Sequence, residues 1–284
     1  MALWRFDAIG TRWDIETARE LGEDERAAVD AVIERFDREW SRFREDSVVS
    51  SLGGGGSAEL PADAADMLEL YRELSEATDG AVNPLVGAGL SALGYDASIS
   101  LVAGAARPAP QDWQDILGWT ERLTLTEPAA IDVGALGKGR LVDLVRAELA
   151  HIPGNLVVDA SGDLAVRGAA VRIALEHPFD ARRAIGVATI ADQALCASAI
   201  NRRAWGDGLH HVLDARTGMP VRTWAATWAI ADDAMHADAA ATALFFDGGA
   251  ELAARWGVEW VRMSTDGRAQ RSSGCPVELF TAAS

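Results

Sequence analysis

The sequence has few cysteines, no long apolar run and no excess of positive charge. Its 284 residues include two cysteines, too few for a disulfide framework, so nothing in the chain demands an oxidising compartment. No stretch of about 18 apolar residues could span a bilayer. Lys and Arg number 26 against 43 Asp and Glu, a formal charge of −17. We expect no nucleic-acid partner, because so acidic a chain would be repelled by a polyanion.

The remaining composition is that of a globular protein, with 49% hydrophobic residues. The length fits one unit over residues 1–284 or two closely packed lobes. Residues 1–7 alternate like a strand and contain neither the basic nor the apolar region of a signal peptide. We therefore expect a cytoplasmic protein, or an extracytoplasmic one if a leader has been removed. Any phosphate would be held locally by a metal, backbone amides or a few cations.

The hydrophobic pattern predicts several helices and many short strands. Apolar residues at three- and four-residue steps predict an amphipathic helix over residues 24–43. Clustered strands with helices between the clusters favour an α+β fold with largely antiparallel sheets packed with helices. Residues 97–128 show weak periodicity and are expected to connect other elements. Further helices are predicted over 62–78, 139–150 and 234–246, and strands over 3–18 (two strands or a bent one), 155–160, 163–167, 170–176, 185–190, 209–213, 225–230 and 258–264.

A glycine-rich segment, residues 131–139, leads from a strand into a helix. Its small residues would let backbone amides approach an anion at the positive end of that helix. It is not a Walker A loop, because the GxxxxGK spacing is absent and no Ser or Thr follows Lys138. A tight strand-to-helix turn with an exposed Lys138 explains the segment equally well, so both interpretations remain open.

Asp238 and Thr242 are four residues apart and would share one face of a helix. A carboxylate and a hydroxyl on one face suit a hard cation such as Mg²⁺. The alternative is that Asp238 is an N-cap-type residue of an alanine-rich helix, and the octapeptide alone favours that. Residues 237–243 are nearly all small, so a neighbouring element is expected to pack very close to them.

Two adjacent histidines, His210 and His211, would point to opposite faces of a strand, so they cannot both bind one ion. We expect one to be catalytic and the other exposed. A zinc site is disfavoured because Cys196 and Cys275 lie 79 positions apart (275 − 196) and no HExxH or CxxC occurs. Ser198 lacks the GxSxG elbow of a hydrolase nucleophile. Cys196 is expected to be a buried small hydrophobe.

Seven short segments of the chain, taken in order, resemble those of one protein family. The segments are Gly10-Thr11 and residues 41–47, 78–84, 132–139, 159–163, 211–218 and 237–243. In the same order, the family patterns that they resemble are M-G-T, S-x-[FY]-x-x-x-S, T-D-G-x-F-D-P, D-L-G-G-[IL]-[AG]-K-G, [ND]-x-G-G-D, H-[IV]-[IVL]-D-P-x-T-G and A-D-x-x-[AS]-T-A. Each is weak alone, but the ordered set is specific. The chain resembles the ApbE family, the FAD:protein FMN transferases.

This resemblance implies an ApbE-like, T-fold-like α+β fold and a reaction on FAD. Family members hold the FAD diphosphate with Mg²⁺ and move FMN onto a threonine hydroxyl of a target protein, releasing AMP. The target would be an acceptor flavoprotein or a membrane redox subunit. Carried over, Mg²⁺ would be held by Asp238, Thr242 and the Ala135 carbonyl, with His211 helping to deprotonate the threonine. FAD would be lined by Ile9, Phe43, Ala81, Val82, Asn83, Asp132, Lys138, Ser198 and Leu213.

The chain departs from the family pattern at several positions. The family's T-S-G segment is Ala197-Ser198-Ala199 here, and Ser161 replaces the first glycine of the G-G-D turn. The metal ligands, His211 and Lys138 survive, so we expect metal-dependent FAD chemistry. Two alternatives stay open: an Mg²⁺-dependent FAD diphosphatase that uses water and yields FMN and AMP, and a non-catalytic FAD-binding protein. The transferase and the diphosphatase need the same ligands, so the sequence does not separate them.

Overall fold

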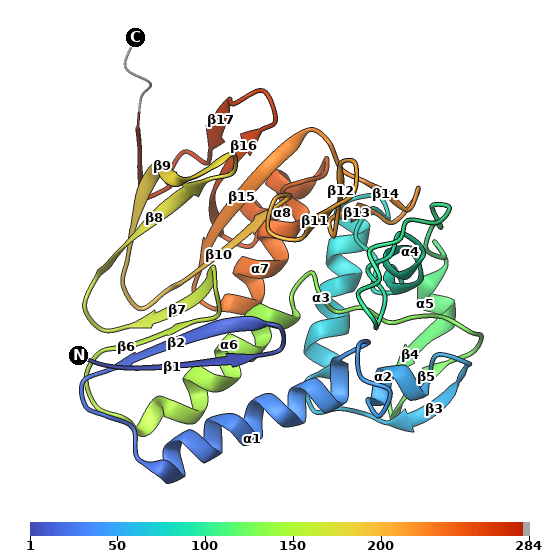
Figure 1. The fold of residues 1–284 in the computed structure, drawn as a ribbon, viewed down its shortest axis with the longest axis horizontal. Coiled ribbons are helices and arrows are strands. Elements are labelled where there is room, and N and C mark those ends of the chain that lie inside the picture. The colour runs from blue at the N-terminus through green and yellow to red at the C-terminus, as the bar shows by residue number, and fades with distance from the viewer. Residues whose placement is uncertain (281–284) are drawn as a thin grey trace.

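The computed structural model describes residues 1–280, and it confirms the predicted α+β class (Figure 1). None of the helices within these residues is both long enough and apolar enough to cross a bilayer. The helices are α1 (Glu23–Trp40), α2 (Val48–Ser51), α3 (Ala64–Ala77), α4 (Gly87–Ala92), α5 (Trp113–Ile116), α6 (Gly137–Glu148), α7 (Ala234–Ala243) and α8 (Gly249–Arg255), with a short 3-10 helix, η1 (Leu149–His151).

An eight-stranded sheet in the order β1-β2-β6-β7-β10-β15-β16-β17 forms the centre, and all its neighbouring strands are antiparallel. Its strands are β1 (Ala2–Ala8), β2 (Thr11–Thr17), β6 (Leu156–Asp159), β7 (Asp163–Arg167), β10 (Ala194–Ala199), β15 (Trp224–Ala231), β16 (Glu259–Ser264) and β17 (Ala269–Arg271). The smaller sheets contain β3 (Gly56–Glu59), β4 (Leu117–Trp119) and β5 (Arg122–Leu125); β8 (Val171–His177), β9 (Asp180–Ile190) and β18 (Val277–Leu279); β11 (Ala204–Trp205) and β12 (Leu209–His210); and β13 (Leu213–Asp214) and β14 (Met219–Pro220).

The large sheet separates two hydrophobic cores. Along β15, Trp228 and Ile230 pack on the side of β8 and β9, whereas Ala229 between them packs on the side of the helices. This alternation follows from the two-residue period of a strand. The helix-side core continues through α1, α3, α6 and α7 to the sheet of β3, β4 and β5. Figure 1 shows α6 and α7 against the large sheet and the sheet of β3, β4 and β5 farther from it.

Helix α1 shows how local sequence sets an element's ends. The Gly22 amide donates to the Glu25 carboxylate at 2.7 Å, and the acidic first turn suits the positive end of the helix dipole. The helix ends at Trp40, three residues before its predicted end, because Ser41 adopts an extended backbone. Phe43 therefore lies in the following turn and not on the helix.

The other predicted elements are mostly present, with three corrections. Residues 3–18 form two strands, and the helices predicted over 62–78, 139–150 and 234–246 are α3, α6 and α7 with shifted ends. The prediction that residues 97–128 only connect is wrong, because α5, β4 and β5 form there. The strand predicted over 209–213 is split between β12 and β13. Strand β10 was not predicted, because its Ala-Leu-Cys-Ala-Ser-Ala sequence gives no polar alternation.

Candidate functional site

Helices α6 and α7 meet at a contact that only glycine allows. A Cβ on Gly139 would lie 2.1 Å from the Ala234 carbonyl oxygen and 2.7 Å from Asp238 Cβ. The Gly139 amide donates to Asp238 Oδ2 at 2.9 Å. We call this contact of Gly139, Ala234 and Asp238 the α6–α7 seam. It confirms that an element packs closely on the alanine-rich helix.

The start of α7 is capped by residues other than Asp238. Asp233 is the N-cap and accepts from the His236 amide at 2.8 Å. The Asp143 carboxylate of α6 accepts from the amides of Ala234 and Met235, each at 2.9 Å. The interpretation of Asp238 as an N-cap-type residue is therefore wrong, since it lies inside the helix.

The Asp238 carboxylate is buried, with 4% of the residue exposed. Its pKa lies well above the ordinary value, because burial disfavours the charge and the Asp163 carboxylate adds repulsion that Lys138 only partly offsets. Thr242 is half-buried one helical turn further along. The seam thus holds a carboxylate with too little positive charge around it.

Lys138 pairs with an acid that we did not include among the predicted site residues. Its Nζ lies 3.0 Å from Asp163 Oδ2 and donates to the Ala160 carbonyl at 3.4 Å. Burial lowers the pKa of Lys138, but the carboxylates of Asp163 and Asp238 outweigh this and raise it. The alternative of an exposed lysine is wrong, because the Lys138 side chain is mostly buried, with only 26% of it exposed. The signal for Asp163 was its place at the end of the [ND]-x-G-G-D segment.

The glycine-rich turn before α6 does not present a row of free amides. The Gly134 amide donates to Asp132 Oδ1 at 2.8 Å, and the Gly139 amide donates to Asp238. A phosphate cradle would need such amides to be available. Close helix packing, not anion capture, therefore explains Gly139.

Arg42 links the Asp132 carboxylate to aromatic side chains. Its Nε lies 2.5 Å from Asp132 Oδ2, and the two side chains are 7% and 13% exposed. The guanidinium carbon lies 4.2 Å from the ring centre of Phe43 and 5.1 Å from that of Tyr95. Tyr95 also stacks on Trp205, with ring centres 5.6 Å apart. We call Phe43, Tyr95 and Trp205 the aromatic cluster.

The two histidines have different environments. His210 is buried, its Nε2 donates to the Val221 carbonyl at 2.8 Å, and its Nδ1 accepts from the Val212 amide at 3.3 Å. The expectation that one of the pair is exposed is therefore wrong. Within residues 1–280 the buried Nδ1 of His211 has no hydrogen-bond partner. Burial, followed by the charge of Arg203, lowers the pKa of His211 to about 3, so its ring is neutral.

Three residues predicted to line FAD lie in the buried turn after α3. Ala81, Val82 and Asn83 are at most 5% exposed. The Asn83 side chain donates to the Pro110 carbonyl at 2.7 Å and accepts from the Leu85 amide at 2.8 Å. Its amide group therefore holds this loop together.

The other predicted FAD contacts come from separate elements. Ile9 lies in the turn between β1 and β2, with φ of +46°. Leu213 is buried in a cluster with Trp205. Ser198 lies on β10, beside a small cavity that Ser161 also lines. A hollow of about 400 Å³ beside α3 is lined by none of the predicted site residues.

Charged residues from distant parts of the sequence act on one another across the site. The charges of Lys138 and Asp132 affect the pKa of His211, and those of Lys138, Asp163 and Arg203 affect the pKa of Asp238. Within residues 1–280 no three His, Cys, Asp or Glu side chains are grouped to hold a metal ion. A cation at Asp238 would therefore need hydroxyl and carbonyl ligands as well.

Solved structures share this arrangement of an antiparallel sheet, helices and loop sheets. The ApbE protein from Thermotoga maritima has a TM-score of 0.81 and 22% identity, covering 96% of this chain and 97% of its own. The flavin transferase ApbE from Vibrio cholerae has a TM-score of 0.78 and 20% identity, covering 96% of this chain and 97% of its own. The Pseudomonas stutzeri flavinyl transferase ApbE, apo form, has a TM-score of 0.78 and 22% identity, covering 96% of this chain and 94% of its own. These likenesses define the class of fold.

The family follows from the sequence match. The chain matches the ApbE family over residues 9–261 and belongs to it, which confirms the resemblance found in the sequence. A curated relative, the FAD:protein FMN transferase of Rhodobacter capsulatus, is 27% identical over 286 residues. That alignment covers 92% of this chain and 55% of the relative, so the chain spans about half the relative's length.

Proposed function

We propose that this protein is an Mg²⁺-dependent FAD:protein FMN transferase. In this reaction a threonine oxygen of the target forms a bond to the FMN phosphorus, and the bond between that phosphorus and the AMP oxygen breaks. The observation that carries the proposal is the buried Asp238 carboxylate, which accepts a hydrogen bond from the Gly139 amide and whose charge Lys138 only partly offsets. Membership of the ApbE family and the name of the curated relative support it.

The residues at the seam fit a magnesium ion. Asp238 and Thr242 supply a carboxylate and a hydroxyl from one helix face, and Ala135 would add its carbonyl. Mg²⁺ prefers such hard oxygen ligands, and a cation would relieve the charge that raises the pKa of Asp238. When bound, the ion would neutralise charge on the FAD diphosphate and on the departing AMP.

Lys138 would assist with the same negative charge. Its Nζ is held near the seam by Asp163 and the Ala160 carbonyl. Because the pKa of Lys138 is raised, the ammonium stays protonated at neutral pH. We infer that it attracts the diphosphate and does not act as a base.

His211 would accept the proton of the incoming threonine. Its neutral ring has a nitrogen, Nδ1, without a partner within residues 1–280. Burial is the main cause of the low pKa of about 3, and the charges of Arg203 and Lys138 lower it further. A diphosphate bound near these cations would offset them and raise the pKa of His211 toward the range of an effective base.

The flavin would bind along the aromatic cluster and the turn after α3. Phe43 is 36% exposed and offers a ring face for stacking, while Ala81, Val82 and Leu213 provide apolar walls. Ile9, Asn83, Asp132, Lys138 and Ser198 complete the lining that we propose. Asn83 would act by holding its loop, since both ends of its amide are bonded there.

The test combines the protein with FAD, Mg²⁺ and a flavoprotein or membrane redox subunit that carries a target threonine. We expect a fluorescent acceptor band in a denaturing gel and AMP in the supernatant. A matched acceptor with threonine replaced by valine should give no band. Absence of a band with several acceptors would contradict the proposal.

Chromatography without an acceptor separates the two other functions. Stoichiometric release of FMN and AMP at the rate seen with acceptor would indicate an FAD diphosphatase. FAD that stays intact with and without acceptor would indicate a binding protein. A transferase requires that FAD consumption depend on the acceptor.

A further inference from the structure

We propose that Tyr71 is a positioning residue, which fixes the turn over residues 132–136 so that the Ala135 carbonyl points toward a metal ion. This rests on the magnesium site of the proposed function and adds a residue to it. Tyr71 lies on α3, far from the turn in the sequence, and belongs to none of the segments that resemble the family.

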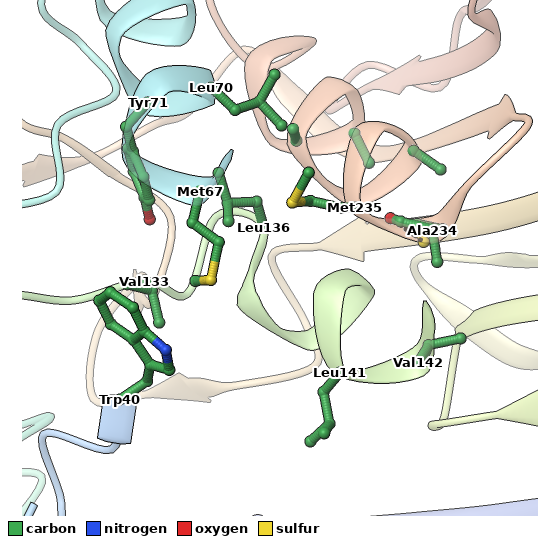
Figure 2. Close-up of a cluster of buried hydrophobic side chains, with 14 of the residues drawn as sticks. Trp40, Met67, Leu70, Tyr71, Val133, Leu136, Leu141, Val142, Ala234 and Met235 are labelled. Carbon is green, nitrogen blue, oxygen red and sulfur yellow. Dashed lines mark hydrogen bonds between the residues drawn. The ribbon is translucent and has the colours of Figure 1, made fainter. Parts of the chain in front are cut away.

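The hydroxyl of Tyr71 makes two hydrogen bonds to the backbone of this turn. It donates to the Asp132 carbonyl at 3.0 Å and accepts from the Ala135 amide at 3.2 Å. The residue is 1% exposed. Figure 2 shows Tyr71 and Met67 extending from α3 toward the segment that carries Val133 and Leu136.

These bonds orient successive peptide planes. Tyr71 holds the peptide that contains the Asp132 carbonyl and the peptide that contains the Ala135 amide. The Leu136 amide donates to the Val133 carbonyl at 3.2 Å. Because a trans peptide is planar, this bond turns the Ala135 carbonyl to the opposite side, away from Val133. Within residues 1–280 no hydrogen bond is donated to that carbonyl, so it is available as a ligand.

The side-chain end of the turn is held independently. Asp132 accepts from Arg42 and from the Gly134 amide, so its carboxylate stays in place without Tyr71. The Ala135 amide has only the tyrosine hydroxyl as its partner within residues 1–280. Removing that hydroxyl should therefore loosen the metal-facing end of the turn more than the Asp132 end.

The test compares Tyr71→Phe with the wild type and with Ser75→Ala. Ser75 lies on the same helix and accepts a buried hydrogen bond from Trp113 Nε1 at 3.1 Å, so its loss matches the loss of one buried hydroxyl. Mn²⁺ affinity would be measured by electron paramagnetic resonance. We expect Tyr71→Phe to weaken binding about tenfold, as substitutions behind a metal ligand do, and Ser75→Ala to leave it unchanged.

A second measurement, by ¹⁹F NMR, keeps the Tyr71 hydroxyl in place. The chain has two tyrosines, so 3-fluorotyrosine in a Tyr95→Phe background gives one ¹⁹F signal, from Tyr71. We expect Mg²⁺ to shift this signal over the same concentration range that fills the metal site. In metal-free protein, Tyr71→Phe should also speed hydrogen exchange of the Ala135 amide.

The outcomes separate this inference from the function on which it rests. A wild-type protein that binds neither Mn²⁺ nor Mg²⁺ would remove the metal site and the proposed function together. Normal metal affinity in Tyr71→Phe, or an unshifted ¹⁹F signal while metal binds, would overturn the role of Tyr71 and leave the proposed function standing.

Discussion

The α6–α7 seam and the aromatic cluster contribute to one candidate site but are held together by different forces. At the seam, small residues bring two helices so close that a single added Cβ would overlap the Ala234 carbonyl. In the aromatic cluster, Phe43 is 36% exposed, and its ring packs edge-on to Tyr95 with centres 5.3 Å apart. One region depends on close packing, and the other depends on stacking near the surface.

This difference indicates a division of roles. Close-packed interiors have few alternative arrangements, so the seam can hold Asp238 in one place. An exposed side chain such as Phe43 changes rotamer readily and adapts to a flat ligand. We therefore expect substitutions at the seam to affect metal binding and folding, and substitution of Phe43 to affect mainly the affinity for FAD.

The largest effect is expected at the seam, from Asp238→Asn. Loss of the carboxylate should lower transfer to an acceptor by about 1000-fold, equivalent to about 4 kcal/mol of activation free energy. Gel fluorescence with purified acceptor measures this rate. Retention of metal-dependent transfer would show that the metal lies elsewhere.

The same variant should show an opposite effect on stability without metal. Because the folded-state pKa of Asp238 is raised, ionising it costs stability as pH rises from its unfolded value toward that raised pKa. The metal-free wild type should therefore lose thermal stability over this window relative to Asp238→Asn. Melting temperatures from pH 4 upward, with a chelator present, measure the difference.

The next largest effect is expected from Gly139→Ala. Overpacking at the seam should cost about 3 kcal/mol, or roughly 150-fold in the folding equilibrium. Gly54→Ala is the matched control, since nothing lies within 4 Å of its added Cβ, and it should be neutral or slightly stabilising. Urea unfolding of both variants tests this, and equal stabilities would contradict the close contact.

The charge of Lys138 at the seam and the charge of Asp132 beside the aromatic cluster both affect the pKa of His211. His211→Gln should lower kcat about 100-fold. Because its folded-state pKa is about 3, His211 contributes stability above pH about 6.5 that is lost as pH falls toward 3. The variant should therefore melt with a shallower pH dependence between pH 7 and 4.5. His151→Gln, whose parent side chain is 58% exposed, should keep the rate.

The smallest effect is expected in the aromatic cluster. Phe43→Ala should raise the KM for FAD about fivefold, or about 1 kcal/mol of stacking, with kcat and melting temperature nearly unchanged. Phe179→Ala removes a more exposed ring, 56% exposed, and serves as the control. A fall in kcat as large as that of His211→Gln would contradict the proposed division of roles.

Motif order made the family predictable from the sequence, and it also selected the candidate site residues. Asp238 and Lys138 could be found because their segments keep recognisable spacing, and α+β class followed from clustered strand patterns. Asp163 could have been predicted, because it is the last residue of its turn segment. The roles of Tyr71 and Arg42 could not be predicted, because a hydrogen bond from a distant helix or turn leaves no local sequence pattern.

For two residues, Gly139 and His210, hydrogen bonds in the folded chain overturn what the sequence indicates. In the sequence, the glycine-rich segment that ends at Gly139 indicates anion binding, but the Gly139 amide donates to the Asp238 carboxylate across the seam. His210 reads as an exposed partner of His211, but it is bonded inside the protein at both ring nitrogens. The partner of Gly139 lies 99 positions away in the chain, and His210 is enclosed by Val212 and Val221 of the loop that follows it.

The sequence by itself determined the acidic charge, the α+β class, the family and the set of polar residues available for chemistry, because these follow from composition and local order. Only the tertiary structure decided which amides are free, which carboxylate lacks a full counter-charge and which side chain holds the Ala135 turn. Burial and hydrogen bonding across long sequence separations set these properties, and both exist only once the helices and the sheet have packed.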